Sequence, residues 1–218
     1  DNKNFIYKNI GELFYFDFYE SLTLSEYIDV NKLTKKNLFL ENLPSNCRKI
    51  DNLKITRDIL QGLDFLHNLS ISHHDLKLDN IILVNDNNDC YAKIIDFGLA
   101  AHEKHLSNNN SYITCGSVPY MSPEKFKLYF LEENNSDLNQ IYYYNAYKSD
   151  IWSVGIILYL LLNINFPFKK AHKSDPMYTL FLSNNKDNSN LEDMTESEFN
   201  VFLQFSINGS NLKNINCI

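Results

Sequence analysis

The stretch "SHHDLKLDN", Ser72 to Asn80, places an aspartate, a lysine and an asparagine in one short run. Asp75 follows two histidines, Lys77 stands two positions after it, and Asn80 stands three positions after the lysine. An aspartate can take a proton from a hydroxyl group, and amide and carboxylate oxygens are the ligands that Mg²⁺ prefers. The run therefore predicts a catalytic loop that combines a base, a cation and a metal ligand.

A second acidic group follows a predicted β-hairpin. Two apolar runs, Ile81–Val84 and Tyr91–Ile95, flank the turn sequence "NDNNDC". The tripeptide "DFG", Asp96 to Gly98, comes next. A hairpin brings its two ends together, so Asn80 and Asp96 are expected to share one site. Transfer of a phosphoryl group from ATP needs a base beside the attacking hydroxyl, metal ions on the phosphates and a cation for the growing charge. The candidates are Asp75 as base, Lys77 as cation, and Asn80 with Asp96 as metal ligands.

Four motifs in order resemble those of protein kinases. "HHDLKLDN" is similar to the catalytic-loop pattern H-R-D-L-x-x-x-N, with His74 in place of the arginine, and "DFG" matches the metal-binding motif. "SPE" at Ser122–Glu124 resembles A-P-E, and "YKSDIWSVGIILYLLL" resembles the helix that anchors the catalytic loop through an aspartate, here Asp150. The resemblance spans roughly residues 11–168.

The resemblance implies an α+β, protein-kinase-like fold, with a mainly helical large lobe, short β-hairpins and the last strands of the small lobe. It implies a serine/threonine protein kinase that transfers the γ-phosphoryl group of Mg-ATP to Ser or Thr hydroxyls of a protein substrate. The lysine two positions after the base, Lys77, and Ser117 in "CGSVPY" favour Ser and Thr over Tyr as acceptors.

The same resemblance implies a nucleotide site with ATP and Mg²⁺ as cofactors. "LFYFDFYESLTLSEYI", Leu13–Ile28, resembles the strand and hinge that hold adenine, with Asp17 and Tyr19 beside the base. Ile82 resembles the apolar residue that packs under adenine, and Lys77 is expected to approach the phosphates.

The small lobe is largely missing from the 218 residues. Their six glycines contain no G-x-G-x-x-G, and neither lysine before the predicted hinge, Lys3 or Lys8, fits the lysine that pairs with the α- and β-phosphates. We expect an incomplete kinase domain: residues 1–19 as a remnant of the small lobe and hinge, and 20–218 as the large lobe, with a tail unassigned from about residue 183. The alternative is a pseudokinase, or a kinase-like binding module without turnover.

Composition narrows the partners and the location. The formal charge is −7, which argues against nucleic acid because phosphate binding needs clustered Lys and Arg. The longest apolar run, Ile151–Leu162, is shorter than the roughly 20 residues of a membrane span, so no membrane span is expected. Four cysteines without a C-x-x-C pair favour reduced thiols. They suggest a cytoplasmic location, with the nucleus left open.

Helical periodicity predicts helices over Ser21–Val30, Ile50–His67 and Ser149–Leu162, the last buried on all sides. A further helix is expected to open at Ser122-Pro123-Glu124, because proline suits a first helical turn. Residues 130–145 resemble an inserted loop.

The two histidines are expected to serve structure. His73 resembles the kinase histidine that packs against the DFG phenylalanine, here Phe97. A metal cluster of His73, His74 and Asp75 is the alternative, but it lacks further His ligands at helical spacing. His74 is mostly uncharged at neutral pH if its pKa is ordinary, so it is a poor anchor for a phosphate on the loop after DFG. Activity is therefore expected without loop phosphorylation.

Overall fold

The computed structural model describes part of the chain: residues 5–9, 12–16, 22–32, 51–86, 89–102, 110–133 and 143–184. Asp17 and Tyr19 lie outside these residues, and so does the boundary between residues 19 and 20. Their predicted roles stay predictions. Within the described residues no helix has the length and apolar character of a membrane span.

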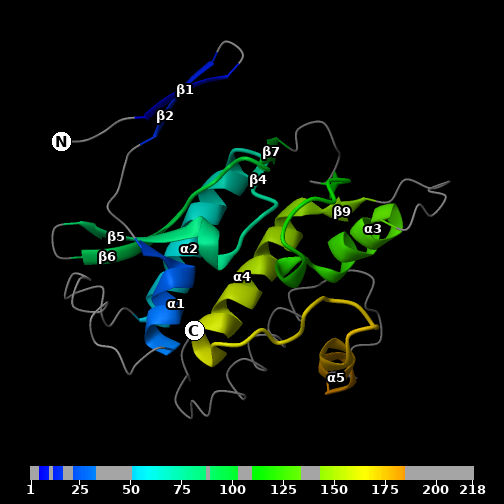
Figure 1. Cartoon of the computed structure of the whole chain (residues 1–218). Helices are drawn as coiled ribbons and strands as arrows, with labels where there is room; N and C mark the ends of the chain where they lie inside the picture. The colour runs from blue at the N-terminus through cyan, green and yellow to red at the C-terminus, as the bar shows by residue number, and fades with distance from the viewer. Residues whose placement is uncertain are drawn as a thin grey trace.

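Helices make up most of the body (Figure 1). They are α1 (Leu24–Lys32), α2 (Asn52–Asn68), α3 (Pro123–Glu133), α4 (Ala146–Asn163) and α5 (Pro176–Asn184). The starts of the helices follow local chemistry. Asp51 caps α2 by accepting the Leu53 N–H. Thr23 and Glu26 form a reciprocal capping box at the start of α1.

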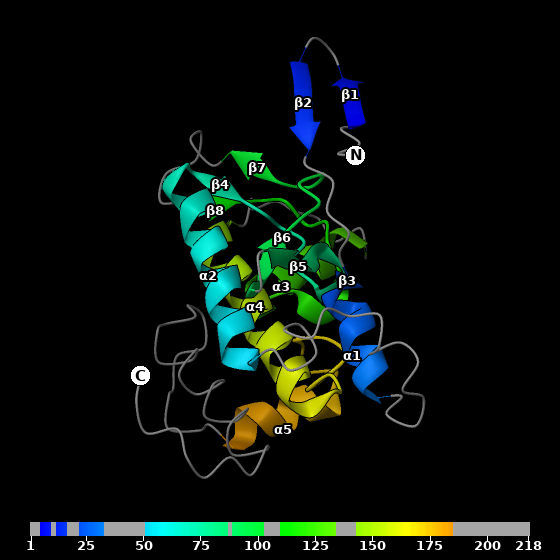
Figure 2. The same cartoon turned by 90° about the vertical axis from the view of Figure 1, so that its left-hand side faces the viewer.

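Helix α4 is the central element. Nearly its whole surface is buried, as its continuous apolar sequence predicts, and α2 packs along it (Figures 1 and 2). Asn145 caps its first turn by accepting the Lys148 N–H at 3.0 Å. Because α4 cannot shift without disturbing the core, any loop bonded to its polar first turns is held firmly.

The strands form small antiparallel sheets, which confirms the α+β architecture. One sheet has the order β3 (Leu22–Thr23), β5 (Ile81–Asp86), β6 (Asp89–Ile94), and β5 with β6 is the predicted hairpin. The others pair β1 (Phe5–Asn9) with β2 (Glu12–Phe16), β4 (Ile71–Ser72) with β7 (Ala101–His102), and β8 (Asn110–Ser111) with β9 (Tyr144–Asn145). The β1–β2 hairpin projects away from the helical body (Figure 2).

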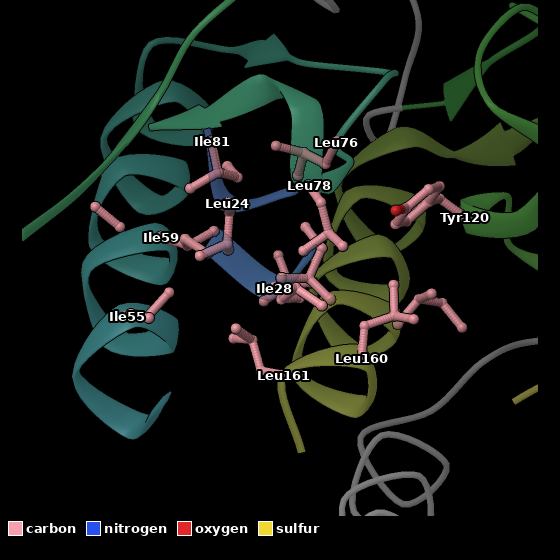
Figure 3. Close-up of a cluster of buried hydrophobic side chains, with 14 of the residues drawn as sticks. Leu24, Ile28, Ile55, Ile59, Leu76, Leu78, Ile81, Tyr120, Leu160 and Leu161 are labelled. Carbon is pink, nitrogen blue, oxygen red and sulfur yellow. The ribbon is translucent and has the colours of Figure 1, made fainter. Parts of the chain in front are cut away.

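The hydrophobic core reaches into the catalytic loop (Figure 3). Side chains from α1, α2, α4 and the loop converge there, among them Leu24, Ile28, Ile55, Ile59, Leu76, Leu78, Leu160 and Leu161. Leu76 and Leu78 are buried on either side of the half-buried Lys77. The loop is therefore fastened by its leucines while Lys77 stays available to the site.

Three expectations need correction. The predicted loop over residues 130–145 is wrong at both ends, because α3 continues to Glu133 and β9 occupies Tyr144–Asn145. The helix predicted from Ser21 begins at Leu24, since Leu22 and Thr23 pair with β5. Helix α5 was not anticipated, because its mostly apolar sequence has little amphipathic periodicity to reveal it.

The cysteines also differ from expectation. Cys90 is disulfide-bonded and buried, whereas Cys115 is free and exposed. The expectation of reduced thiols is therefore wrong for Cys90. Sequence spacing carries no signal for such a bond, because it requires two Cβ atoms about 4 Å apart in the folded chain.

Candidate active site

Asp150 fastens the catalytic loop to α4. Its carboxylate is 2% exposed. One oxygen accepts the His73 N–H at 2.9 Å, and the other accepts the His74 N–H at 3.0 Å. The Nε2 atom of His67, on α2, lies 3.0 Å from the same carboxylate. The predicted anchoring of the loop by Asp150 is confirmed, and His67 is an additional partner that no motif indicated.

His73 is fully buried and both of its ring nitrogens face protein groups. Its Nδ1 accepts the Asp75 N–H at 3.3 Å, so the proton sits on Nε2, which donates to the Ile95 carbonyl at 3.1 Å. The ring packs against Phe97 with centroids 5.4 Å apart. The predicted packing is confirmed, and no nitrogen is left for a metal ion.

His74 has a left-handed backbone conformation, with φ at 66°. Such a conformation is unfavourable for a residue with a side chain, and it persists only where neighbouring groups hold it. The His74 N–H donates to Asp150, and its carbonyl accepts from the Lys125 ammonium at 2.6 Å. Buried charged groups thus hold both sides of this residue, just before Asp75.

The His74 ring connects the loop to the segment after DFG. The Tyr144 hydroxyl donates to the Ile113 carbonyl and lies 3.2 Å from His74 Nδ1. Because that hydroxyl proton is used on Ile113, the hydroxyl oxygen accepts the Nδ1 proton. Ser72 Oγ lies 2.7 Å from Nε2. Neutral hydroxyl groups therefore surround the histidine that replaces the family's arginine.

Asp75 lies in contact with two of the other predicted site residues, Lys77 and Asn80. Lys77 Nζ lies 3.0 Å from Asp75 Oδ2 and donates to Ser117 Oγ at 3.3 Å. The Asn80 amide donates to the Asp75 carbonyl at 2.8 Å. Within the described part of the chain, Asp75 Oδ1 is buried and has no hydrogen-bond partner. One carboxylate oxygen therefore pairs with a cation while the other is left without a donor.

The buried side chain of Tyr120 lies beside the same loop. Burial raises the pKa of Tyr120 to about 12, with Asp79 and Asp75 adding to the rise and the Leu78 N–H opposing it. Tyr120 therefore stays protonated at physiological pH.

The predicted metal ligands lie at the joined ends of the hairpin. Ile95 N–H donates to the Asn80 carbonyl at 2.9 Å, so Asp96 follows directly beside Asn80. Asn80 commits its NH₂ group to Asp75, which leaves the amide oxygen as a ligand. Asp96 is exposed, and its Oδ1 accepts the Gly98 N–H at 3.2 Å. An amide oxygen and a carboxylate side by side fit Mg²⁺, which keeps other positions for phosphates and water.

Other metal-site arrangements are not supported. In the described ranges no three His, Cys, Asp or Glu side chains group closely enough to hold a metal ion. The alternative cluster of His73, His74 and Asp75 is therefore not formed. Mg²⁺ does not require such a cage, because it is usually held by one or two carboxylates together with substrate phosphates.

Ile82, the predicted adenine contact, lies on β5. It is 7% exposed on β5, paired with Thr23 on β3. Its strand neighbours Ile81 and Leu83 belong to the main core cluster and Ile82 does not. Successive side chains of a strand point to opposite faces, so Ile82 lies on the face away from that core. Asp17 and Tyr19, the other nucleotide contacts predicted, lie outside the described residues.

Comparison with known protein families identifies the family of the chain. A sequence model described as the protein kinase domain matches residues 10–210. The chain belongs to the protein kinase family. The expected kinase-like α+β fold is confirmed with it.

Individual relatives of this kinase domain agree. The chain is 32% identical over 140 residues to CBL-interacting serine/threonine-protein kinase 17 of Arabidopsis thaliana, covering 60% of this chain and 29% of the relative. It is 31% identical over 182 residues to serine/threonine-protein kinase KSP1 of Saccharomyces cerevisiae, covering 82% and 16% respectively. It is 34% identical over 161 residues to calcium-dependent protein kinase 6 of Plasmodium berghei, covering 70% and 9%. The matched region thus spans less than a third of each relative.

Proposed function

We propose that the protein transfers the γ-phosphoryl group of ATP to serine or threonine hydroxyls of other proteins. The supporting observation is the loop in which Asp75 lies 3.0 Å from Lys77 and is bonded through its backbone to Asn80. Family membership supplies the reaction class. The retained base, cation and amide are the groups that the reaction needs.

In the proposed reaction Asp75 accepts the proton of the acceptor hydroxyl as that oxygen attacks the γ-phosphorus and the bond to ADP breaks. The Lys77 ammonium lies beside the carboxylate and offsets negative charge that accumulates on the transferred group. Asn80 and Asp96 would hold Mg²⁺, which neutralises phosphate charge when bound. Ile82 offers an apolar surface to the adenine ring.

Ser117 supports Ser and Thr as the acceptors. Its hydroxyl accepts a hydrogen bond from Lys77, so the segment after DFG is bonded to the cation beside the base. This contact matches the family pattern in which a Ser or Thr of that segment steadies the base of Ser/Thr kinases. The acceptor hydroxyl would enter beside this contact.

The test is transfer of labelled phosphate from ATP to mixed protein substrates by the protein expressed from its own gene. The Asp75→Asn variant, prepared identically, is the control. We expect Mg²⁺-dependent label on serine and threonine but not on tyrosine, and loss of this label in the control. Equal labelling by the two proteins, or label confined to tyrosine, would contradict the proposal. Nucleotide binding without transfer would instead support a binding module.

A further inference from the structure

A lysine is buried under the catalytic loop. Lys125, in the first turns of α3, is 3% exposed, and its Nζ atom donates to the His74 carbonyl oxygen at 2.6 Å. Burial lowers its pKa, while the negative charges of Asp150, Cys115 and Asp75 oppose that shift. Lysine is almost never fully buried unless it is paired, so its place here calls for a physical reason.

The carbonyl that Lys125 holds belongs to the strained residue of the loop. His74 has its φ at 66°, and Asp150 holds its N–H while Lys125 holds its C=O. The two bonds fix the peptide planes on both sides of the residue. The next residue is Asp75, so the direction in which the base leaves the backbone depends on this turn.

The ammonium also lies near the Asp75 oxygen that has no hydrogen-bond partner in the described residues. A Cβ atom added to Gly116 would lie 3.3 Å from Lys125 Nζ, 3.6 Å from Asp75 Oδ1 and 2.7 Å from the His74 carbonyl oxygen. These three atoms therefore surround one small gap, which stays open because residue 116 has no side chain. Asp75 Oδ1 is buried without a hydrogen-bond partner in the described residues. The nearby positive charge attracts it.

We propose that Lys125 is a positioning residue for the catalytic base. Its ammonium holds the turn at His74 and attracts Asp75 Oδ1, so that Oδ2 is presented beside Lys77. The inference rests on the proposed phosphoryl transfer and adds a residue to it. Filling space does not account for a lysine here, because an apolar side chain would fill the same place without burying a charge.

Three variants separate positioning from folding. Lys125→Met keeps the length and removes the charge, Lys125→Arg keeps a charged donor, and Lys127→Met changes an exposed lysine on the same helix. We expect kcat of Lys125→Met to fall about 10- to 100-fold, because small misplacements of catalytic groups have effects of this size. Tm should fall only modestly, because the His74 carbonyl loses one donor. KM for ATP should change less than about twofold, Lys125→Arg should recover part of kcat, and Lys127→Met should match the parent protein.

The outcomes are distinct. Unchanged kcat in Lys125→Met, or a loss of kcat in Lys125→Arg as large as that in Lys125→Met, would overturn the inference. If the unsubstituted protein transfers no phosphate, the proposed function fails. Hydrogen exchange of residues 72–78 then tests separately whether Lys125 holds the loop in position. Faster exchange at the amides of His74 and Asp75 in Lys125→Met, with Lys127→Met unchanged, would support the positioning role. Equal exchange rates in all variants would contradict the positioning role of Lys125.

Discussion

The catalytic loop and the loop before α5 are both organised by one buried aspartate, yet they differ in what they leave unsatisfied. Asp175, which is 6% exposed, accepts four backbone N–H groups: those of Lys169, Lys170, Met177 and Tyr178. Both of its oxygens are used. In the catalytic loop Asp150 is equally satisfied, but Asp75 keeps a buried oxygen without a partner and His74 keeps a strained backbone.

The difference separates a loop that only joins elements from one that carries the candidate catalytic residues. A buried polar group without a partner costs free energy, and so does a left-handed residue with a side chain. The segment around Asp175, residues 169–178, has neither cost. The catalytic loop has both, and buried charges from α3 and α4 hold it in place. Substitutions in the two loops should therefore have opposite effects on rate and stability.

The largest effect is expected from Asp75→Asn. This change keeps the shape of the side chain and removes the base, and general-base catalysis is worth about 10²- to 10⁴-fold in rate. We expect kcat to fall by that factor, while Tm changes little because one of the two carboxylate oxygens has no hydrogen bond to lose. Steady-state kinetics and thermal melting of one preparation measure both. A large fall in Tm would contradict the proposed difference between Asp75, which is needed for rate, and Asp175, which is needed for stability.

The second-largest effect is expected from removing the Asp150 carboxylate. Asp150→Ala leaves the buried N–H groups of His73 and His74 without an acceptor. Each orphaned donor costs about 1–3 kcal/mol, and activity should fall with stability because the loop loses its support. Denaturant unfolding gives the free-energy change. The milder Asp150→Asn keeps one acceptor oxygen, so its free energy of unfolding should lie between those of the unsubstituted protein and Asp150→Ala. An unchanged free energy of unfolding in Asp150→Ala would refute the anchoring role.

Asp175→Asn should lower stability by about 1–3 kcal/mol at neutral pH, because hydrogen bonds to a charged acceptor are lost, and it should leave kcat unchanged. Burial alone raises the pKa of Asp175, but its four backbone N–H bonds outweigh burial, and the pKa is lowered.

The sign of the pH dependence follows from that lowered pKa. The stabilisation is present above the ordinary aspartate pKa of about 3.9 and is lost as the pH falls through the lower folded value. Unfolding experiments from pH 6 downward should show an acid-sensitive component in the parent that Asp175→Asn lacks. An identical pH profile in the two proteins would contradict this.

The smallest effect is expected from Tyr144→Phe. This change removes the hydroxyl that joins His74 to the Ile113 carbonyl, worth about 0.5–1.5 kcal/mol. Hydrogen exchange over residues 111–117 should become roughly two- to tenfold faster. Tyr143→Phe is the matched control, since Tyr143 is 47% exposed.

The contact of Tyr144 with His74 and Ile113 also leads to an expectation about phosphorylation of the segment after DFG. Ser111 is 1% exposed, and Thr114 donates its hydroxyl proton to Glu132. Ser111 is therefore buried, and the Thr114 hydroxyl is already bonded to Glu132. Phosphatase treatment should therefore leave the exchange of this segment unchanged. A large effect of the phosphatase would show that a phosphate, rather than Tyr144, orders it.

Local patterns predicted much of this molecule. The hairpin, helices α2 and α4, the contact of His73 with Phe97 and the anchoring by Asp150 follow from motifs or periodicity that lie within one stretch of chain. The start of α1 was predicted three residues too early, although Thr23 and Glu26 have the spacing of a capping box.

The residues that were missed act across the fold. Lys125 has the sequence of an ordinary helix lysine, and only the packing of α3 against the loop buries it. Tyr144 ends a run of three tyrosines, and nothing in the run distinguishes the one that reaches His74. His67 contacts Asp150 from another helix. Such roles depend on tertiary proximity, which local sequence patterns do not encode.

Gly116 has a consequence for how the chain tolerates variation. Its φ of 126° and the 2.7 Å approach of a Cβ to the His74 carbonyl oxygen exclude every other amino acid for the same reason, whatever its polarity or size. A saturation library at this codon would therefore have one functional member. The exposed Cys115 beside it has no such restriction. Adjacent codons would thus lie at opposite extremes of a mutational map.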